Sequence, residues 1–545
     1  MKLLHVTASP YADQRPGTSG LRKKVTVFQQ PAYLELFIQA ICNALPNRHG
    51  ATWILGGDGR YFNDQAIQII LRIAAANGIA RVVVGQHGIL STPAVSHLIR
   101  KRNALGGIIL TASHNPGGPA HDFGVKYNAS NGGPAPESLT EQIWAISRDL
   151  HAYQIIDGNQ PIDIASKGEH PLGNLIVEVC DPTTDYMEMM ESIFDFDKIA
   201  SLLRSKNFSL RYDALHAVTG PYAKELFEHR LGAPEGSVVH GTPLPDFGGL
   251  HPDPNLVYGK TLVDVMFRPQ APDFGAASDG DGDRHMILGR EFFVSPGDSL
   301  AILLAHAHRI PAYRDKVHGV ARSLPTSLAV DDVANMLQIP LYETPTGWKY
   351  FGDLMDAGKV TFCGEESFGA GSTHIREKDG LWAVLFWLSI LADSQKSVAE
   401  IVRDLWLQHG RHYFTRHDFE SLPAPVAQDI VADLKIDLKK LPGKVISGIA
   451  IQSAEDFSYH DPIDGSLVEH QGIRIIFADR SRVVIRLSGT GTTGATLRLY
   501  FERFVQSSGN LHLNVQQALS PFMHFAYELT GILRRTGRSK ADVIT

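Results

Sequence analysis

The sequence predicts an α/β protein: three related α/β domains with mixed or parallel sheets, followed by a smaller C-terminal α+β domain. Two patterns indicate this fold class. Short apolar segments alternate with helix-like segments up to about residue 408, and beyond that point the segments alternate as antiparallel strands do. The length of 545 residues fits about three to four domains of roughly 150 residues each.

The first α/β unit begins with a strand-like segment at 52–57 and a helix-like segment at 66–76. A strand at 81–85, a helix at 93–104 and a strand at 106–110 complete a βαβαβ pattern. Apolar strands separated by helices favour a parallel sheet with both faces covered. Ligands of such sheets bind at the carboxyl ends of the strands.

The same alternation recurs twice without any repeat at the level of single residues. The second unit is expected over 210–294, and its last strand runs into the segment DGDGDR at 279–284. The third is expected over 316–369 and ends in the segment CGEESFG at 363–369. The apolar window 381–392 is shorter than the roughly 20 residues that span a bilayer, so it predicts a buried helix.

The C-terminal part has a different texture. Residues 409–420 are polar and turn-like, whereas 472–478, 482–487 and 496–502 alternate as antiparallel strands do, and 515–529 predicts a final helix. We therefore expect four domains, at 1–179, 180–294, 295–407 and 408–545.

Charge and cysteine content exclude several classes of protein. Lys and Arg number 51 against 58 Asp and Glu, a net charge of -7, which argues against nucleic acid or an anionic membrane as partner. The three cysteines are far apart and unpaired in spacing, so neither a disulfide framework nor a zinc site is indicated. The N-terminus lacks the apolar core of a signal peptide. A cytoplasmic location is expected.

Three aspartates on alternate residues, Asp279, Asp281 and Asp283, follow an apolar strand-like run. Carboxylates spaced by glycines can converge on one hard cation. A calcium EF-hand loop needs Gly at its sixth position and Glu at its twelfth, but Arg284 and Arg290 stand there. The alternative is an acidic turn, in which three crowded carboxylates would repel one another. The sequence favours a Mg²⁺ site.

Ser113 and His114 lie in the segment TASHNPGG that follows the apolar strand at 106–110. A serine at a strand end beside a histidine can be a nucleophile. The segment does not match the Gly-x-Ser-x-Gly pattern of esterases, and the pair alone is also typical of a turn or helix cap. Combined with a metal loop, it indicates phosphoryl chemistry on Ser113.

Glu365 and Ser367 stand at another predicted strand end, where they could bind sugar hydroxyls, although adjacent glutamates are also common on solvated surfaces. The glycines of 489–494 match G-x-G-x-x-G, but the following residues alternate as a strand, which argues against a dinucleotide site. Arg486 and Arg498 flank this loop and favour a phosphate site. The basic segments 15–24 and 376–379 are either part of the same site or solvated turns.

These segments together resemble the α-D-phosphohexomutase superfamily, specifically its phosphoglucomutase branch. The resemblance extends over nearly the whole chain and keeps the order of the family's motifs. The matching segments are PGTSGLRKK (16–24), TASHNPGG (111–118), DFGVKYN (122–128), DGDGDR (279–284), PTGWKYFG (345–352), CGEESFG (363–369), HIREKDGLW (374–382) and RLSGTGTTGATLRLY (486–500).

The resemblance implies four domains around a central cleft and a role for each loop. Ser113 would be the phosphoserine, and Asp279, Asp281 and Asp283 would bind Mg²⁺ together with the phosphoryl group on Ser113. The sugar would meet Glu365, Ser367, Thr346 and Gly347. Its phosphate would meet Arg22, Arg284, Lys378, Arg486, Ser488, Thr490 and Arg498. The candidates for proton transfer would be Lys126, His114 and Lys378, and a lysine would suit this task if burial and nearby cations lowered its pKa.

The implied activity is the interconversion of α-D-glucose 1-phosphate and glucose 6-phosphate through a glucose 1,6-bisphosphate intermediate. The substrate class is a small sugar phosphate. A phosphomannomutase, a phosphoglucosamine mutase, a metal phosphatase and a non-catalytic binding relative are the alternatives. The sequence carries no signal for the oligomeric state.

Overall fold

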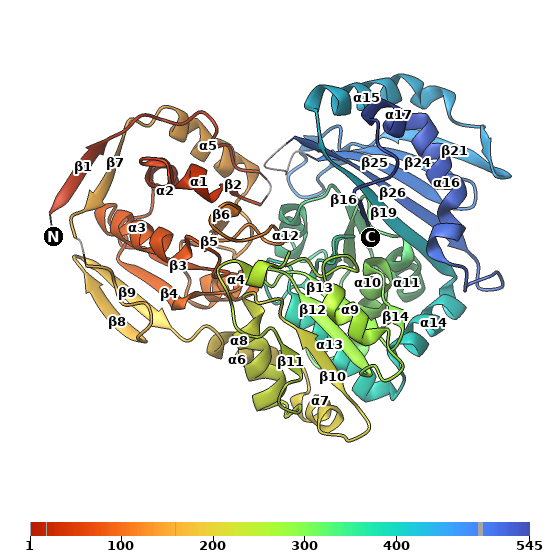
Figure 1. The fold of residues 1–545 in the computed structure, drawn as a ribbon, viewed down its shortest axis with the longest axis horizontal. Helices are drawn as coiled ribbons and strands as arrows, with labels where there is room; N and C mark the ends of the chain where they lie inside the picture. The colour runs from red at the N-terminus through yellow and green to blue at the C-terminus, as the bar shows by residue number, and fades with distance from the viewer. Residues whose placement is uncertain (1, 18, 159, 489–493) are drawn as a thin grey trace.

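The computed structural model describes residues 2–17, 19–158, 160–488 and 494–545. Three α/β domains and a C-terminal domain surround a central region, with the N-terminal domain and the C-terminal domain on opposite sides of it (Figure 1). The predicted fold class is confirmed. Within the described ranges, no helix is both long and apolar enough to cross a membrane.

The first domain is built on a seven-stranded mixed sheet whose central strands are parallel. Its order is β2 (Leu21–Lys24), β6 (Asp122–Ala129), β5 (Gly106–Leu110), β3 (Thr52–Gly57), β4 (Arg81–Ile89), β9 (Leu175–Cys180) and β8 (Gly168–Leu172). The surrounding elements are α1 (Val25–Phe28), α2 (Tyr33–Ala44), α3 (Asn63–Ala76), α4 (Thr92–Lys101), α5 (Glu137–Arg148) and the pair β1 (Leu3–Thr7) with β7 (Ala152–Ile156). The buried apolar faces of these helices cover the sheet.

The second domain has a five-stranded mixed sheet in which three parallel strands are followed by one antiparallel strand and by a last strand that pairs antiparallel with it. Its order is β11 (Val238–Val239), β10 (Leu210–Asp213), β12 (Phe274–Ser278), β13 (His285–Gly289) and β14 (Phe292–Phe293). Its helices are α6 (Thr184–Ile193), α7 (Phe196–Leu203), α8 (Thr219–Ala223), the π-helical η1 (Lys224–Arg230) and α9 (Lys260–Met266). The aspartate-rich segment forms the turn between β12 and β13.

The third domain has a four-stranded sheet and the most apolar helix of the chain. The strand order is β16 (Leu341–Thr344), β15 (Val320–Ser323), β17 (Phe362–Gly364) and β18 (Ala370–Ser372). The helices are α10 (Pro296–Ala305), α11 (Ala329–Leu337), α12 (Trp348–Asp356), α13 (Gly380–Ser394) and α14 (Val398–His409). Helix α13 is buried along nearly its whole length, as the apolar window predicts.

The C-terminal domain is a seven-stranded antiparallel sheet with helices α15 (Ala424–Asp437), α16 (Val515–Thr530) and α17 (Ile532–Thr536) packed against it (Figure 1). The strand order is β20 (Val445–Ile446), β21 (Ile449–Asp456), β24 (Ile473–Phe477), β25 (Arg482–Ser488), β26 (Ala495–Val505), β19 (Arg411–Leu422) and β27 (Val543–Ile544). A short pair, β22 (Tyr459–His460) with β23 (Leu467–Val468), lies outside this sheet.

The expectation that residues 409–420 form a polar turn is wrong. They form β19, which pairs with β26 from Arg411 opposite Val505 to Leu422 opposite Ala495. Polar residues are tolerated in this strand because they find charged partners: His412, for example, is 3% exposed and pairs with Asp332. A buried polar group that is paired in this way loses little on burial, so the strand lacks the usual apolar alternation.

The third and C-terminal domains share a mixed interface. Leu324 and Tyr350 of the third domain pack with Tyr459 and Tyr500 in one apolar cluster. Charged pairs add to this contact, such as Arg474 with Glu343. The interface positions Arg486 and Arg498 in one cleft with the loops of the α/β domains.

Candidate active site

The loops at the carboxyl ends of the strands line a cleft. One cavity in it has a volume of about 240 Å³, and an adjoining cavity of about 340 Å³ shares part of its lining. The smaller cavity brings together Arg22, Ser113, His114, Lys126, Asp281, Asp283, Arg284, Thr346, Gly347, Glu365, Ser367, Lys378, Arg486, Ser488 and Arg498. Asp279 lies beside them in the aspartate turn, and Thr490 lies outside the described residues. Segments up to 476 positions apart (22 to 498) thus meet at one place.

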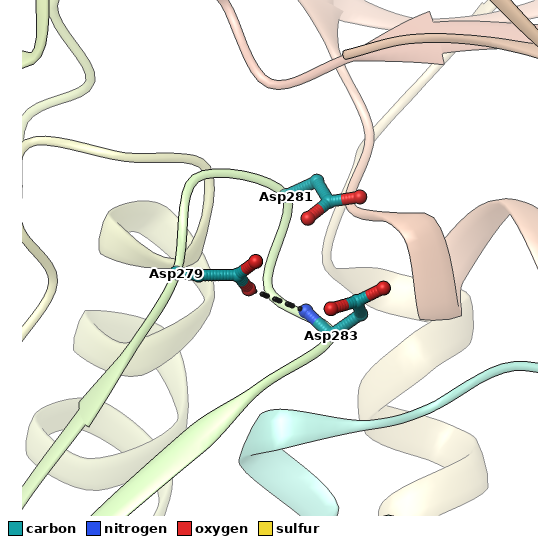
Figure 2. Close-up of side chains that lie close together, drawn as sticks. All are labelled: Asp279, Asp281 and Asp283. Atoms are coloured by element: carbon teal, nitrogen blue, oxygen red, sulfur yellow. Dashed lines mark hydrogen bonds between the residues drawn. The ribbon is translucent and has the colours of Figure 1, made fainter. Parts of the chain in front are cut away.

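Asp279, Asp281 and Asp283 point toward one another from the turn between β12 and β13 (Figure 2). One carboxylate oxygen from each lies within 4.8 Å of those of the other two, and all three residues are buried. Asp279 Oδ1 accepts hydrogen bonds from the backbone N–H groups of Asp283 (2.9 Å) and Arg284 (3.0 Å). These bonds fold the turn so that the carboxylates converge.

The burial and negative charge of these three carboxylates suit a bound cation. Oδ1 of Asp281 and Oδ1 of Asp283 are buried without a hydrogen-bond partner. Burial and the neighbouring carboxylates of Asp281 and Asp283 raise the pKa of Asp279 well above its usual range. Oxygen ligands that are buried, unpaired and mutually repelling are the donor set that a hard divalent cation binds. These features indicate that the turn is a metal-binding site.

Ser113 lies against this turn. Its hydroxyl donates a hydrogen bond of 2.7 Å to Asp279 Oδ2. Its backbone has a φ of +52°, an uncommon conformation for a residue other than glycine. A Cβ atom added to Gly280 would lie 2.3 Å from the carbonyl oxygen of Ser113, so only glycine allows the two loops to approach this closely.

Two residues beneath the serine loop were missed by the sequence analysis. Arg60 donates from Nη2 to the Ser113 carbonyl oxygen (2.8 Å) and from Nε to Asp58 (2.9 Å). Asp58 also accepts a bond of 2.6 Å from the hydroxyl of Thr111. The signal was present in the segment GDGR at 57–60, because opposite charges directly after an apolar parallel strand face the ligand edge of the sheet.

A third missed residue is Thr92 at the start of α4. Its hydroxyl donates a bond of 2.6 Å to Asp281 Oδ2, and its backbone N–H donates to the Asp281 carbonyl oxygen (3.0 Å). Thr92 therefore orients the second aspartate from the first domain. No local motif marks it, since the contact spans 189 positions.

His114 lies beside the serine in an environment of cations. Its Nδ1 is 3.4 Å from Ser113 Oγ. Burial, together with the positive charges of Arg284 and Arg22, lowers the pKa of His114 well below its usual range. The imidazole is therefore neutral at physiological pH.

The two candidate lysines have different partners. Lys378 Nζ lies 3.1 Å from Asp283 Oδ2, and Lys126 pairs with Glu377, a residue to which the sequence analysis assigned no role. Burial lowers the pKa of Lys378, but Asp283 and Glu365 outweigh burial and raise it above its ordinary value. The expectation of a lowered lysine pKa is thus wrong for Lys378, because the charges of Asp283 and Glu365 outweigh both burial and the neighbouring cation Arg284.

Two of the residues expected to bind the sugar, Glu365 and Gly347, hold each other in place. Glu365 Oε1 accepts a bond of 3.1 Å from the backbone N–H of Gly347, and its own N–H donates to the Gly369 carbonyl oxygen (2.8 Å). The hydroxyl of Thr346 is buried without a partner. Ser367 lines both cavities. These groups offer hydrogen-bond donors and acceptors to a polar ligand.

The two arginines of the C-terminal domain stand side by side on the sheet. Arg486 of β25 is directly opposite Arg498 of β26 in the strand register. Arg486 Nε donates to the Gln471 carbonyl oxygen (3.2 Å), and Arg498 Nε lies 3.7 Å from Asp418 Oδ2. The residues after the loop form β26, as their alternation predicts, so the helix that a dinucleotide motif requires directly after its glycines is not there.

Models of one protein family match nearly the whole chain. Three models described as phosphoglucomutase/phosphomannomutase alpha/beta/alpha domains I, II and III match residues 13–154, 184–291 and 296–409. A model described as the phosphoglucomutase-1 C-terminal domain matches residues 411–542. The chain belongs to the phosphoglucomutase/phosphomannomutase family of the α-D-phosphohexomutase superfamily. The resemblance noted in the sequence is thereby confirmed.

Individual relatives are similar in sequence to this phosphohexomutase over nearly the full length of both chains. It is 54% identical to a phosphoglucomutase of Rhizobium radiobacter, covering 99% of both chains. It is 50% identical to a probable cytoplasmic phosphoglucomutase of Arabidopsis thaliana, covering 100% of this chain and 99% of the relative. A solved structure of the Paramecium phosphoprotein pp63/parafusin, described as a phosphoglucomutase in an open form, aligns with a TM-score of 0.91 at 46% identity, covering 100% of this chain and 99% of that one.

Proposed function

We propose that this chain is a phosphoglucomutase, an isomerase that interconverts α-D-glucose 1-phosphate and glucose 6-phosphate. The observation that carries the proposal is the 2.7 Å hydrogen bond from Ser113 to Asp279 of the buried aspartate group. A nucleophile joined to a metal ligand and facing a pair of arginines suits a sugar that carries phosphate at either end. Relatives at 50–54% identity bear the same functional name.

Mg²⁺ is the metal that we propose for the aspartate group. Asp279, Asp281 and Asp283 would hold it together with a phosphoryl oxygen on Ser113. The bound ion would neutralise phosphoryl charge, which lowers the barrier to transfer. Magnesium suits a site of this kind because it is bound by few carboxylates plus phosphate oxygens.

The first transfer would move the phosphoryl group from Ser113 to the free hydroxyl of glucose 1-phosphate. The bond from Ser113 Oγ to phosphorus breaks and a sugar oxygen–phosphorus bond forms. The proton of the hydroxyl passes to a basic side chain, and the serine oxygen takes up a proton. Lys126, His114 and Lys378, which line the cleft, would carry out these proton transfers. The product of this step is glucose 1,6-bisphosphate.

The second transfer needs the intermediate to turn over in the cleft. Arg486, Ser488, Thr490 and Arg498 would hold the phosphate that does not react, with Arg22, Arg284 and Lys378 nearer the reacting one. Glu365, Ser367, Thr346 and Gly347 would hold the sugar in either orientation. The other phosphoryl group then passes to Ser113 Oγ, leaving glucose 6-phosphate. We propose a cytoplasmic location for this reaction, as in several named relatives.

A coupled assay tests the proposal. Purified protein with glucose 1-phosphate and a trace of glucose 1,6-bisphosphate should form glucose 6-phosphate, with much lower turnover of mannose 1-phosphate and glucosamine phosphates. Release of inorganic phosphate should be slight. A preference for mannose 1-phosphate would overturn the glucose assignment, and steady phosphate release would indicate a phosphatase.

A further inference from the structure

Lys126 is held in the cleft by a carboxylate that lies outside the metal-binding group. Lys126 of β6 is 7% exposed, and its ammonium group pairs with Oε1 of Glu377, which is 1% exposed. The same oxygen accepts a bond of 2.9 Å from the side-chain amide of Asn128. Both donors come from one strand of the first domain, whereas Glu377 comes from the loop before α13.

The loop fixes Glu377 independently of Lys126. On one side, Arg376 donates from Nε to Asp356 (2.5 Å) and from its backbone N–H to the Ser96 hydroxyl (3.1 Å). On the other side, Asp379 accepts bonds from the Tyr186 hydroxyl (2.6 Å) and the Trp382 N–H (3.0 Å). A carboxylate anchored from both sides can orient a flexible lysine side chain, because little further freedom is lost when the pair forms.

The other carboxylates near this lysine have different tasks. Asp281 and Asp283 belong to the metal-binding group, so a bound cation would share their charge. Glu377 is not a member of that group. Ten further charged or titratable groups line the cleft around Lys126. They are Arg22 of β2, His114 beside the serine, Asp281, Asp283 and Arg284 of the aspartate turn, Glu365 and Glu366 after β17, Lys378 before α13, and Arg486 and Arg498 of the C-terminal sheet.

We propose that Glu377 is a positioning residue that holds the side chain of Lys126 oriented in the cleft. This inference rests on the proposed function and adds to it an assignment for one of the two lysines: Lys126 is the lysine that a carboxylate outside the metal-binding group holds in place. A carboxylate that the loop already fixes restricts the rotamers of the lysine it pairs with, so removal of the carboxylate frees that side chain. Lys378 differs, since its partner Asp283 is itself a metal ligand in the proposal.

The test compares Glu377→Gln and Glu377→Asp with Asp356→Asn in the full-length protein. Asp356→Asn loosens the same loop at its Arg376 anchor without touching Lys126. The first readout is the rate of acetylation of Lys126 by acetic anhydride at a single pH, followed by peptide mass spectrometry. We expect the rate to rise severalfold in Glu377→Gln, because the amine is released from its partner, to rise less in Glu377→Asp, and to stay unchanged in Asp356→Asn.

The second readout is the separate effect on kcat and on KM for glucose 1-phosphate. We expect Glu377→Gln to lower kcat by about 10- to 100-fold, mostly without a change in KM, and Glu377→Asp to recover part of this loss. Thermal melting of each variant shows whether it is folded. If Glu377→Gln does not fold, Glu377→Asp decides the question by its acetylation rate.

The inference is overturned if the acetylation rate of Lys126 in the folded Glu377 variants equals that of the wild type. It is also overturned if Asp356→Asn changes the rate equally, since the effect would then come from the loop as a whole. The acetylation readout needs no turnover. A wild-type chain without mutase activity would therefore refute the proposed function while the labelling experiment still decides the role of Glu377.

Discussion

The Ser113 hydroxyl is hydrogen-bonded to Asp279, a residue 166 positions away in another domain. The candidate nucleophile is therefore hydrogen-bonded to an aspartate of the metal-binding turn before any substrate binds. The Arg60 side chain holds the serine backbone from below through the Ser113 carbonyl oxygen. Pre-organisation of this kind reduces the entropy that the protein loses when the reacting groups are aligned.

Replacing the serine tests whether it carries the phosphoryl group. We expect Ser113→Ala to lower the interconversion of glucose phosphates by about a thousandfold or more, because the variant has no oxygen to phosphorylate. Intact-mass spectrometry should show one phosphoryl group mapping to Ser113 in the wild type and none in the variant. Ser166→Ala, at an exposed position, is the matched control and should behave as the wild type. Full activity of Ser113→Ala would refute the mechanism.

Metal binding should depend on pH through Asp279. Burial and the two neighbouring carboxylates raise the pKa of Asp279, so the folded metal-free protein binds this proton more tightly than the unfolded chain does. Its stability therefore falls as the pH rises from the ordinary aspartate range through the folded pKa. A cation must displace the proton, so the gain in Tm from saturating Mg²⁺ should grow as the pH rises above the ordinary aspartate range.

Thermal melting with Mg²⁺ or with EDTA measures this gain at each pH. Asp279→Asn should abolish both the gain and its pH dependence. The control Asp404→Asn changes an aspartate 51% exposed in a surface pair and should keep them. A Mg²⁺ effect of equal size at every pH would contradict the assignment of the turn as the metal site.

The close approach of the two loops should require glycine at position 280. In Gly280→Ala the added Cβ would lie 2.3 Å from the Ser113 carbonyl oxygen, so the aspartate turn must move away from the serine. We expect kcat to fall by about 100-fold, since a displacement of about 1 Å in a catalytic group can cost that much. Gly352→Ala, inside α12 with open space around the glycine, should retain activity and gain up to about 1 kcal/mol of stability. Equal activity of the two variants would contradict the prediction.

The interface between the third and C-terminal domains should weaken at alkaline pH. His412 lies between Asp332 (2.9 Å) and Glu502 (2.8 Å). Burial lowers the pKa of His412, but hydrogen bonds to both carboxylates outweigh burial and raise it to about 9. A base whose pKa is raised on folding contributes stability that is complete below its unfolded pKa and lost as the pH rises through the folded value.

We therefore expect the free energy of unfolding to fall by on the order of 3 kcal/mol between about pH 6.5 and above pH 9. Denaturant unfolding measures this change in free energy, and limited proteolysis reports the unfolding of the C-terminal domain. His412→Gln should be less stable at neutral pH and lack this dependence, whereas His308→Gln, at an exposed position, should retain it. A wild-type stability that is constant over this range would contradict the prediction.

Local sequence was sufficient to predict the α/β units and the chemical groups that their loops supply. The periodicities of strands and helices can be recognised from neighbouring residues. The segment 279–283 contains both the aspartates that supply oxygen ligands and the glycines that let the turn form. The strand β19 could not be predicted in this way, because partners of its buried polar groups, such as Asp332, lie in another domain.

What only the tertiary structure decided is which distant groups face each other and with what charge. The Arg60 contact with Ser113, the Thr92 contact with Asp281 and the pairing of Lys126 with Glu377 join separate segments. The raised pKa of Lys378 has the same origin. Electrostatic interactions depend on distance and burial rather than on chain position, so the sequence determined which chemical groups are available and the packing of the domains determined their state.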